Sequence, residues 1–317
     1  MPVKPERLQH GETVALLAPA SAPPGPGLID RSVAALEKLG FKVKLSRHVR
    51  KRRGFLAGTD RERADDLMQM FADRKVKAIF CVRGGYGTAR LLPLLDYRVI
   101  RQNPKIFVGY SDITSLHCAF LTKSNLISFH GPMFASDFLK QDFPLFTLQS
   151  CLRTLMEPVT PQSICLGYSQ KTVAVLRRGV AIGPLVGGNL SLLCTLIGTP
   201  FQPSFRGKIL FIEDLDEPPY RFDRMLTHLL NAGLLQQVAG IAVGFCNNCE
   251  DPKAKKAKEY RQTLRDVLQE RLLPLKVPVV TGLPFGHVPF NATLPIGVRA
   301  TLDAQKGDLI ITSAAVK

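Results

Sequence analysis

The first half of the chain alternates short apolar runs with segments of helical periodicity, and this pattern constrains the fold most. The apolar runs are typical of buried strands, and they cover residues 14–18, 41–45, 76–82, 106–108 and 126–129. The expected helices are 28–39, 88–95, 113–123 and one whose apolar stripe runs through 64–71. The alternation predicts an α/β fold with a parallel sheet that helices cover on both faces. Ligands of such sheets bind beyond the carboxyl ends of the strands.

Local signals mark the ends of two of these helices. Gly40 follows the helix 28–39, where a left-handed C-terminal cap is expected. Thr59 and Glu62 stand at the spacing of a capping box, just before the apolar stripe of the next helix.

A break in the pattern separates the two halves of the chain. Residues 158–180 contain two prolines and two glycines but no acidic residue, which is typical of a connecting segment. We expect an N-terminal α/β domain over 1–156, a linker over 157–180 and a C-terminal domain over 181–317. The strands expected in the second half are 181–186, 208–212, 238–245, 277–283, 298–302 and 308–312. An amphipathic helix follows the second of them, with apolar residues at helical spacing from 222 to 230.

Two basic segments, 42–53 and 253–261, supply most of a net charge of +16. Neither segment interleaves its basic residues with aromatic ones, and no helix-turn-helix or zinc-finger spacing accompanies them. This favours solvated loops and no nucleic-acid partner, with attraction of a small anionic substrate as the alternative. A nucleic-acid-associated basic protein is kept as an alternative hypothesis for the function.

Cysteine content and hydropathy bear on the compartment. Seven cysteines cannot all pair within one chain, and they are too few for a disulfide scaffold. No run approaches the roughly 18 to 20 apolar residues of a membrane span. The N-terminus lacks the basic region and apolar stretch of a signal peptide. We therefore expect a cytoplasmic protein without a membrane partner.

The segment 105–114 carries the most informative chemical signal. A short apolar strand runs into Gly109, and Ser111 precedes a helix whose first turn carries Asp112. A serine on such a turn is exposed above the sheet edge, where backbone N–H groups can bind a developing oxyanion. The match to G-x-S-x-G is partial, because Ile113 occupies the fifth position. Ser111 is therefore either a nucleophile or only a helix N-cap.

A nucleophilic serine needs a base, and the pattern leaves two histidines open. His130 follows the strand 126–129, and His287 lies in a Gly-His-x-Pro loop after the strand 277–283. Both positions follow the carboxyl end of a strand, where sites of this fold class gather. The loop context favours His287 without excluding His130.

The third group should be a carboxylate that orients the base. The strand 208–212 is followed by four acidic residues among the next five positions. A divalent metal would suit these acids, but no His or Cys stands beside them at metal-ligand spacing. Capping of the next helix accounts for Asp216 and Glu217, which leaves Glu213 or Asp214.

A glycine-rich turn, Arg83-Gly-Gly-Tyr-Gly87, joins the strand 76–82 to the next helix. It matches neither G-x-G-x-x-G nor a P-loop, so a dinucleotide cofactor is not expected. Its glycines instead allow the backbone to approach a substrate closely, with an N–H aimed at an oxyanion.

Together these segments resemble the LD-carboxypeptidase family, which comprises cytoplasmic serine peptidases. The family includes murein tetrapeptide carboxypeptidases and microcin-immunity peptidases. The matching motifs occur in the family's order, and they are Arg83-Gly-Gly-Tyr-Gly87, Gly109-Tyr-Ser-Asp112, His130-Gly-Pro132, Gly187-Gly-Asn-Leu-Ser191, Glu213-Asp214 and Gly286-His287. The resemblance implies a flavodoxin-like or amidotransferase-like N-terminal domain with a parallel sheet, and a smaller, β-rich α/β C-terminal domain.

The resemblance also implies roles for individual residues. Carried over by motif, Ser111 is the nucleophile, His287 the general base and Glu213 its orienting acid. The oxyanion donors are the backbone N–H groups of Gly85 and Asp112. Further candidates for substrate binding are Arg83, Tyr86, His130 and Asn189.

The implied activity is hydrolysis of the L,D-peptide bond that releases terminal D-alanine from muropeptide tetrapeptides in cell-wall recycling. The implied partners are a small anionic peptide and a second copy of the chain in a homodimer. Neither a metal nor a cofactor is implied. The microcin-immunity relatives suggest hydrolysis of a toxic peptidyl-nucleotide as the alternative.

Overall fold

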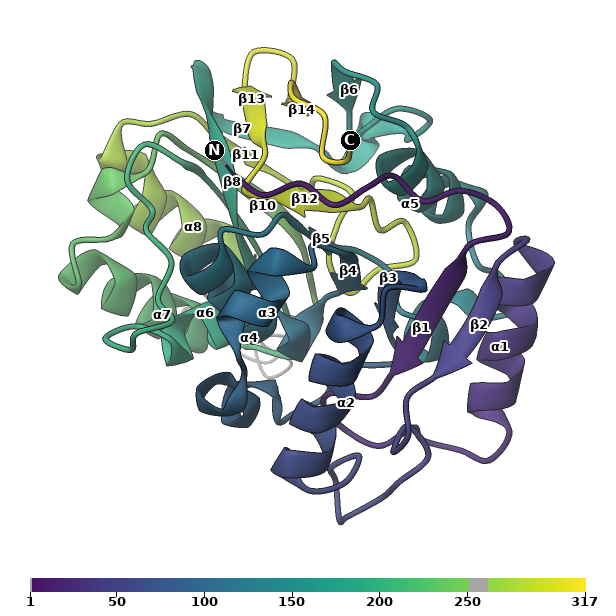
Figure 1. Ribbon diagram of the computed structural model, residues 1–317. Coiled ribbons are helices and arrows are strands. Elements are labelled where there is room, and N and C mark those ends of the chain that lie inside the picture. The colour runs from purple at the N-terminus through teal and green to yellow at the C-terminus, as the bar shows by residue number, and fades with distance from the viewer. Residues whose placement is uncertain (1, 251–261) are drawn as a thin grey trace.

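The computed structural model describes residues 2–250 and 262–317, which form two sheets (Figure 1). The first sheet has six strands in the order β12-β5-β4-β3-β1-β2. Its parallel strands all come from the first half of the chain, and they are β1 (Thr13–Leu17), β2 (Lys42–Leu45), β3 (Val76–Cys81), β4 (Ile106–Gly109) and β5 (Ser128–His130). The α/β class and the parallel sheet predicted from the alternating pattern are confirmed.

Helices cover both faces of the first sheet. They are α1 (Leu28–Lys38), α2 (Asp60–Ala72), α3 (Tyr97–Gln102), α4 (Thr114–Ala119) and α5 (Leu145–Met156). Val14 and Leu16 of β1 belong to the same apolar core as α1, whereas Leu17 belongs to the core of α2, which lies in front of the sheet in Figure 1. Successive side chains of a strand point to opposite faces, so a strand buried on both faces is a continuous apolar run.

The local signals at helix ends have the predicted geometry, but two helices differ in type. Gly40 is left-handed with φ of 86°. The capping box is formed, with 3.2 Å from Glu62 N to Thr59 Oγ1 and 2.9 Å from Thr59 N to Glu62 Oε2. The segment predicted as helix 88–95 is a 3-10 helix, η1 (Thr88–Leu94), which contains Pro93; a proline cannot donate the backbone bond of an α-helix. The segment 113–123 is divided among a 3-10 turn, α4 and a π-helix, namely η2 (Ser111–Ile113), α4 and η3 (Phe120–Ser124).

The second sheet has eight strands in the order β6-β14-β13-β8-β9-β10-β11-β7. Its central strands are parallel, and they are β8 (Val180–Asn189), β9 (Ile209–Leu215), β10 (Gly240–Asn247) and β11 (Val279–Thr281). The antiparallel outer strands are β6 (Gln162–Ser163), β7 (Ala174–Arg177), β13 (Arg299–Asp303) and β14 (Asp308–Ile311). The helices α6 (Leu190–Thr195), α7 (Pro219–Asn231) and α8 (Leu264–Leu272) gather on one side in Figure 1. The short helices elsewhere are η4 (Phe134–Phe138), η5 (Gln170–Thr172), η6 (Leu235–Gln237) and η9 (Leu273–Leu275).

The amphipathic helix of the second half is α7, but its N-terminus differs from the prediction. Pro218 occupies the N-cap position and no side chain caps the helix. Asp216 instead accepts a hydrogen bond from Asn248, and Glu217 pairs with a side chain one turn further along the chain. The prediction that Asp216 and Glu217 cap the helix is wrong, because prolines at its start need no acceptor for a backbone N–H.

Three strands cross the domain limits expected from the sequence. The strand β12 (Leu294–Ile296) follows the second sheet in the chain, yet it pairs antiparallel with β5 at the edge of the first sheet. The strands β6 and β7 lie within the expected linker 157–180 and form the two opposite edges of the second sheet. An added strand satisfies the open hydrogen-bonding edge of β5, which no local pattern in β5 announces.

Candidate active site

The serine singled out by sequence lies on a tight turn at the carboxyl end of β4. The backbone of Ser111 is left-handed, with φ of 65°, a conformation that costs a non-glycine residue about 1–3 kcal/mol. Gly109 permits the turn, because a Cβ there would lie 2.9 Å from Ile113 Cγ1. Tyr110, not Ser111, occupies the N-cap position of η2, and no side chain caps that turn. The hypothesis that Ser111 is only a helix cap is therefore wrong.

Glu213 and His287 form a hydrogen-bonded pair. Glu213 is fully buried in β9, and His287 lies in the loop after β11. The distance between His287 Nδ1 and Glu213 Oε2 is 2.6 Å. Because a carboxylate can only accept, the proton of the neutral imidazole is assigned to Nδ1, and Nε2 is the basic nitrogen.

Gly286 allows the histidine to approach the buried carboxylate. Its φ is 112°, and a Cβ at this position would lie 2.8 Å from Phe245 O and 2.9 Å from Glu213 Cβ. Asn247, at the end of β10, donates from Nδ2 to His287 O at 3.2 Å. Only glycine satisfies both the backbone angle and the lack of space, which explains the Gly-His sequence.

The electrostatic surroundings favour the charged form of His287. Burial lowers the pKa of this imidazole, but the hydrogen bond and the negative charge of Glu213 raise it, and Asp214 and Asp137 add to the increase. The net result is a pKa above the ordinary value of 6.5. The site therefore stabilises the imidazolium form of His287.

Asp214 serves a different part of the structure, although it is adjacent to Glu213 in β9. Asn189 Nδ2 donates to Asp214 Oδ1 at 2.8 Å, and Ser191 N donates to Oδ2 at 2.9 Å. Burial and then the charge of Glu213 raise the pKa of Asp214 to about 6. Neighbouring residues of a strand point to opposite sides, so only one of the two acids can contact His287. Asn189 caps α6 and is not among the residues that line the pocket described next.

Ser111 and His287 line one pocket of about 470 Å³. Arg83 and Gly85 of the glycine-rich turn line it as well. Its other lining residues are Gly84, Tyr110, Met133, Ser136, Lys140, Leu215 and Asn247. Its walls come from segments that follow β3, β4 and β5 of the first sheet and from the ends of β9 and β10 and the loop after β11 of the second. The site thus occupies the place that parallel sheets favour.

The glycine-rich turn packs its backbone against the turn that carries Ser111. A Cβ at Gly84 would lie 3.1 Å from Ser111 Cβ and 3.4 Å from Asp112 N. Gly85 has a φ of 104°, which favours glycine. The Asp112 carboxylate is buried and accepts a hydrogen bond of 2.9 Å from Thr88 N. Burial raises the pKa of Asp112, although the bonds from Thr88 oppose the shift. The side chain of Asp112 is thus a structural link, and its backbone N is the part that lies close to Gly84 of the glycine-rich turn.

Besides Asn189, two further sequence-predicted binding residues are not part of the pocket lining. His130 is fully buried, with its ring 5.8 Å from that of Tyr110 and 5.4 Å from that of Phe211. Neither ring nitrogen has a hydrogen-bond partner, and burial holds the pKa of His130 well below its ordinary value. Tyr86 is 53% exposed and packs edge-to-face on Phe55. The structure therefore places His287, and not His130, in the lining of the pocket that contains Ser111.

Two family models match the chain. The LD-carboxypeptidase N-terminal domain matches residues 14–131, and the LD-carboxypeptidase C-terminal domain matches residues 182–302. A probable murein peptide carboxypeptidase from Bacillus subtilis is 42% identical over 97% of this chain and 94% of its own length. The chain belongs to the LD-carboxypeptidase family.

Solved structures of two similar proteins have the same architecture. A muramoyltetrapeptide carboxypeptidase from Oxalobacter formigenes is 33% identical and superimposes with a TM-score of 0.83, covering 96% of this chain and 99% of that one. The microcin C7 self immunity protein MccF in its apo state is 26% identical, with a TM-score of 0.89 and complete coverage of both chains. These similarities confirm the resemblance and the two-domain α/β fold. They include both kinds of LD-carboxypeptidase relative, so they do not distinguish the substrates.

Several residues of this LD-carboxypeptidase pocket escaped the sequence analysis. Asn247 ends β10, and Tyr110 lies between β4 and Ser111. A systematic search of positions at strand carboxyl ends would have found both. Ser136 and Lys140 lie in a segment without a clear periodic pattern, so the sequence offered no signal for them.

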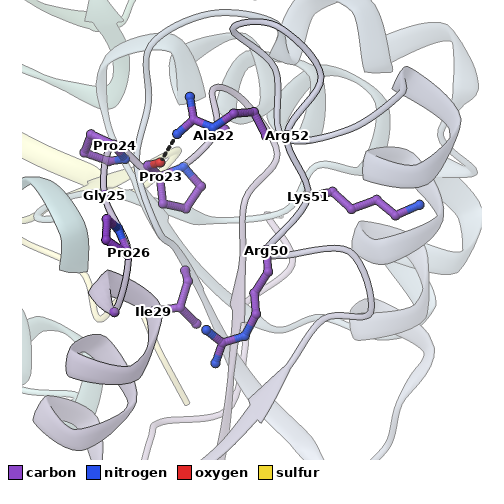
Figure 2. A pocket seen from close by; sticks show the side chains of 10 residues that line it. Ala22, Pro23, Pro24, Gly25, Pro26, Ile29, Arg50, Lys51 and Arg52 are labelled. Carbon is purple, nitrogen blue, oxygen red and sulfur yellow. Dashed lines mark hydrogen bonds between the residues drawn. The ribbon is translucent and has the colours of Figure 1, made fainter.

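The basic segment 42–53 lines a second hollow, of about 350 Å³, beside the proline-rich loop 22–27. Figure 2 shows Arg52 reaching toward this loop, where it donates to Pro23 O at 2.6 Å, whereas Lys51 points away from the loop. Lys51 and the neighbouring arginine at position 50 are paired with nearby carboxylates. All three cations that line the hollow thus have partners within the chain, which supports the interpretation as a solvated loop.

The second basic segment, 253–261, lies outside the described residues. Over 2–250 and 262–317, no group of three or more His, Cys, Asp or Glu is placed to hold a metal ion. No helix within the same ranges is both long enough and apolar enough to span a membrane. The expectation of metal-independent chemistry stays a prediction.

Proposed function

We propose that this protein is a cytoplasmic serine carboxypeptidase that releases terminal D-alanine from muropeptide tetrapeptides during cell-wall recycling, without a metal. The observation that carries the proposal is the pocket shared by Ser111 and His287, with Glu213 bonded to His287. A hydroxyl, an imidazole and an orienting carboxylate are the components of serine-hydrolase chemistry. The printed names of two relatives, a murein peptide carboxypeptidase and a muramoyltetrapeptide carboxypeptidase, support this substrate class.

Acylation begins at Ser111. Its Oγ attacks the carbonyl carbon of the L,D-peptide bond while its proton passes to His287 Nε2. Glu213 stabilises the resulting imidazolium through the bond at Nδ1. When the C–N bond breaks, His287 returns this proton to the amino group of the departing D-alanine. A water molecule then gives a proton to His287 and attacks the acyl-enzyme, and Ser111 regains its proton as the tetrapeptide-derived acid leaves.

The negative charge that develops on the substrate oxygen needs donors beside Ser111. We assign this role to the backbone N–H groups of Asp112 and Gly85, because both belong to turns that pack against each other at the pocket. Loss of one such donor typically costs about 3–4 kcal/mol of transition-state stabilisation.

A carboxypeptidase also has to hold a terminal carboxylate. Arg83 and Lys140 are the cationic side chains among the residues that line the pocket. We assign the carboxylate to Arg83, whose planar guanidinium suits two-point binding and is oriented by a 3.3 Å hydrogen bond from Nη1 to Ala22 O. The test compares the tetrapeptide with a free C-terminal carboxylate and the same peptide with a C-terminal amide. Arg83→Ala should raise KM for the first and leave KM for the second unchanged, as measured by steady-state kinetics.

The direct test is digestion of a purified disaccharide-tetrapeptide followed by mass spectrometry, with and without EDTA. We expect loss of D-alanine in both samples and no loss with Ser111→Ala. Loss of activity in EDTA would contradict the metal-free mechanism. If the folded protein cleaves another substrate but leaves the tetrapeptide intact, the substrate assignment is contradicted and the serine chemistry is not.

The alternative keeps the chemistry and changes the target to a toxic peptidyl-nucleotide. The observation that favours it is the likeness to MccF, whose solved structures include a complex with aspartyl sulfamoyl adenosine. Offering both substrates together in one assay would rank them by kcat/KM.

We further propose that the protein forms a homodimer and does not bind nucleic acid. Light scattering coupled to size exclusion would give the mass in solution. Binding to duplex DNA should stay weak even at low salt. Low salt is the most sensitive condition, because contacts to phosphate are strongest there.

A further inference from the structure

We propose that Tyr110 and Asp137 form a positioning pair that holds the imidazole of His287 in place and stabilises its protonated form. The proposal rests on the proposed function, in which His287 is the base. Tyr110 belongs to the first half of the chain and directly precedes Ser111, whereas His287 belongs to the second half. The pair therefore couples the position of the base to the turn that carries the nucleophile.

The contact between the two halves is a ring contact fixed by a hydrogen bond. The ring of Tyr110 lies 4.9 Å from that of His287, tilted by 59°. Tyr110 is only 4% exposed, and its hydroxyl donates to Asp137 Oδ1 at 3.1 Å. Asp137 is also buried, and its Oδ2 accepts from Met133 N at 2.9 Å. A buried ring tied at its hydroxyl cannot swing aside, so it forms a rigid wall beside the imidazole.

The ring of Tyr110 restricts a rotation of the imidazole that Glu213 alone cannot prevent. The bond between Glu213 and His287 Nδ1 fixes one atom of the imidazole, about which the ring can still pivot. Tyr110 limits that pivot and so fixes where Nε2 points. A misplacement of the base by about 1 Å can lower the rate about 100-fold.

Asp137 adds a negative charge behind the tyrosine. Its carboxylate accepts from Tyr110 and Met133, and Lys140 Nζ lies 3.6 Å from Oδ1. Burial raises the pKa of Asp137, while the Met133 N–H, Lys140 and Tyr110 oppose the shift. Donors on both oxygens suit an ionised carboxylate, and that charge favours the imidazolium form of His287.

Other titratable groups lie near enough to affect the charge of His287, and they are unchanged in the variants used below. They are Glu213 and Asp214 from β9 and His130 from β5, while Arg83 and Lys140 line the same pocket. Of these, Glu213 acts on Nδ1 by direct contact. A change at Asp137 should therefore shift the titration of His287 without abolishing it.

The first experiment separates positioning from folding. We expect Tyr110→Leu to lower kcat about 100-fold with KM nearly unchanged, because only the base is displaced. Tyr110→Phe, which retains the ring, should restore kcat to within about tenfold of wild type. The matched control is Phe107→Leu, a fully buried aromatic of β4 that packs on Phe71 and Phe120. The control should lower the unfolding midpoint but leave kcat within about twofold. A kcat for Tyr110→Leu equal to that of the control would overturn the positioning role.

The second experiment needs no substrate, so it stands even if the tetrapeptide is not cleaved. NMR of histidine-labelled protein gives the pKa of His287, whose resonance is identified by its absence from His287→Gln. We expect Asp137→Asn to lower this pKa by about 0.5 unit, less than the one to three units typical of a carboxylate in direct contact. The control, Asp142→Asn, removes an exposed carboxylate nearby in the chain and should leave the pKa unchanged. Equal pKa values in the two variants would overturn the electrostatic role of Asp137.

Discussion

The two halves of the pocket hold their reactive groups by different means. In the first half the backbone places the proposed nucleophile: Ser111 is left-handed, and Gly84 leaves no side chain between the two turns. In the second half a side-chain hydrogen bond to Glu213 places His287, the proposed base. We call the half with Ser111 the nucleophile half and the half with His287 the base half. Activity should therefore depend most on single atoms and on the backbone in the nucleophile half, and most on charge and pH in the base half.

The largest effect is expected from Ser111→Ala. Removal of the attacking oxygen should lower kcat by about 10⁶-fold, the scale of triad deletions elsewhere. The fold should persist, because alanine has the same backbone requirement at φ of 65° and the serine hydroxyl is at the pocket surface. Kinetics with circular dichroism as the control would measure both. Activity within a few-fold of wild type would assign the nucleophile to another residue.

The next effect concerns the charge of the base half. Glu213→Gln should lower kcat by up to about 10⁴-fold, because an amide can select the wrong tautomer of the imidazole. The pKa of His287 should also fall below its ordinary value, since burial is then opposed only by the weaker contributions of Asp214 and Asp137. NMR titration would check the direction, and a pKa equal to that of the native protein would contradict the assigned pair.

The same pair predicts the pH dependence of the native protein. Only neutral His287 can accept the serine proton, so the acidic limb of kcat/KM should lie above pH 6.5. The pair stabilises the folded state fully below the unfolded pKa of about 6.5, and this contribution is lost as the pH rises through the higher folded value. Denaturant titrations across pH 6 to 9, with Glu213→Gln as control, would show the loss only in the native protein.

A smaller effect tests the backbone of the base half. Gly286→Ala should lower kcat about 100-fold, because its Cβ would press on Phe245 O and Glu213 Cβ and displace the base. Gly233→Ala is the matched control, since its φ is also positive, at 69°, but no atom lies within 4 Å of its Cβ. Both variants place alanine at a positive φ, but only Gly286→Ala adds a close approach to neighbouring atoms. Equal kcat in the two variants would show that the base half tolerates backbone shifts.

The smallest effect is expected outside both halves. A double replacement, Arg50→Ala with Lys51→Ala, should change kcat/KM by less than about twofold, since exposed ion pairs contribute about 0–1 kcal/mol. The side chains concerned are 51% and 53% exposed. A larger loss that disappears at high salt would instead indicate capture of an anionic substrate.

Much of the first half could be predicted from local pattern. The alternation of strands and helices, the capping box at Thr59 and the turn at Ser111 are local features, and the structure contains them. The antiparallel strand β12 and the strands at the edges of the second sheet could not be predicted, because they are short and are stabilised by distant partners.

The sequence by itself determined the parallel architecture and the presence of a serine on a strained turn, because backbone geometry depends on adjacent residues. The local pattern left two histidines and two acids open, the family resemblance implied His287 and Glu213, and only the tertiary structure shows these two bonded to each other. His130 and His287 both follow strands, but packing buries one among aromatic rings and brings the other to Glu213. Glu213 and Asp214 point to opposite sides of β9, and which side faces the pocket depends on residues far away in the chain.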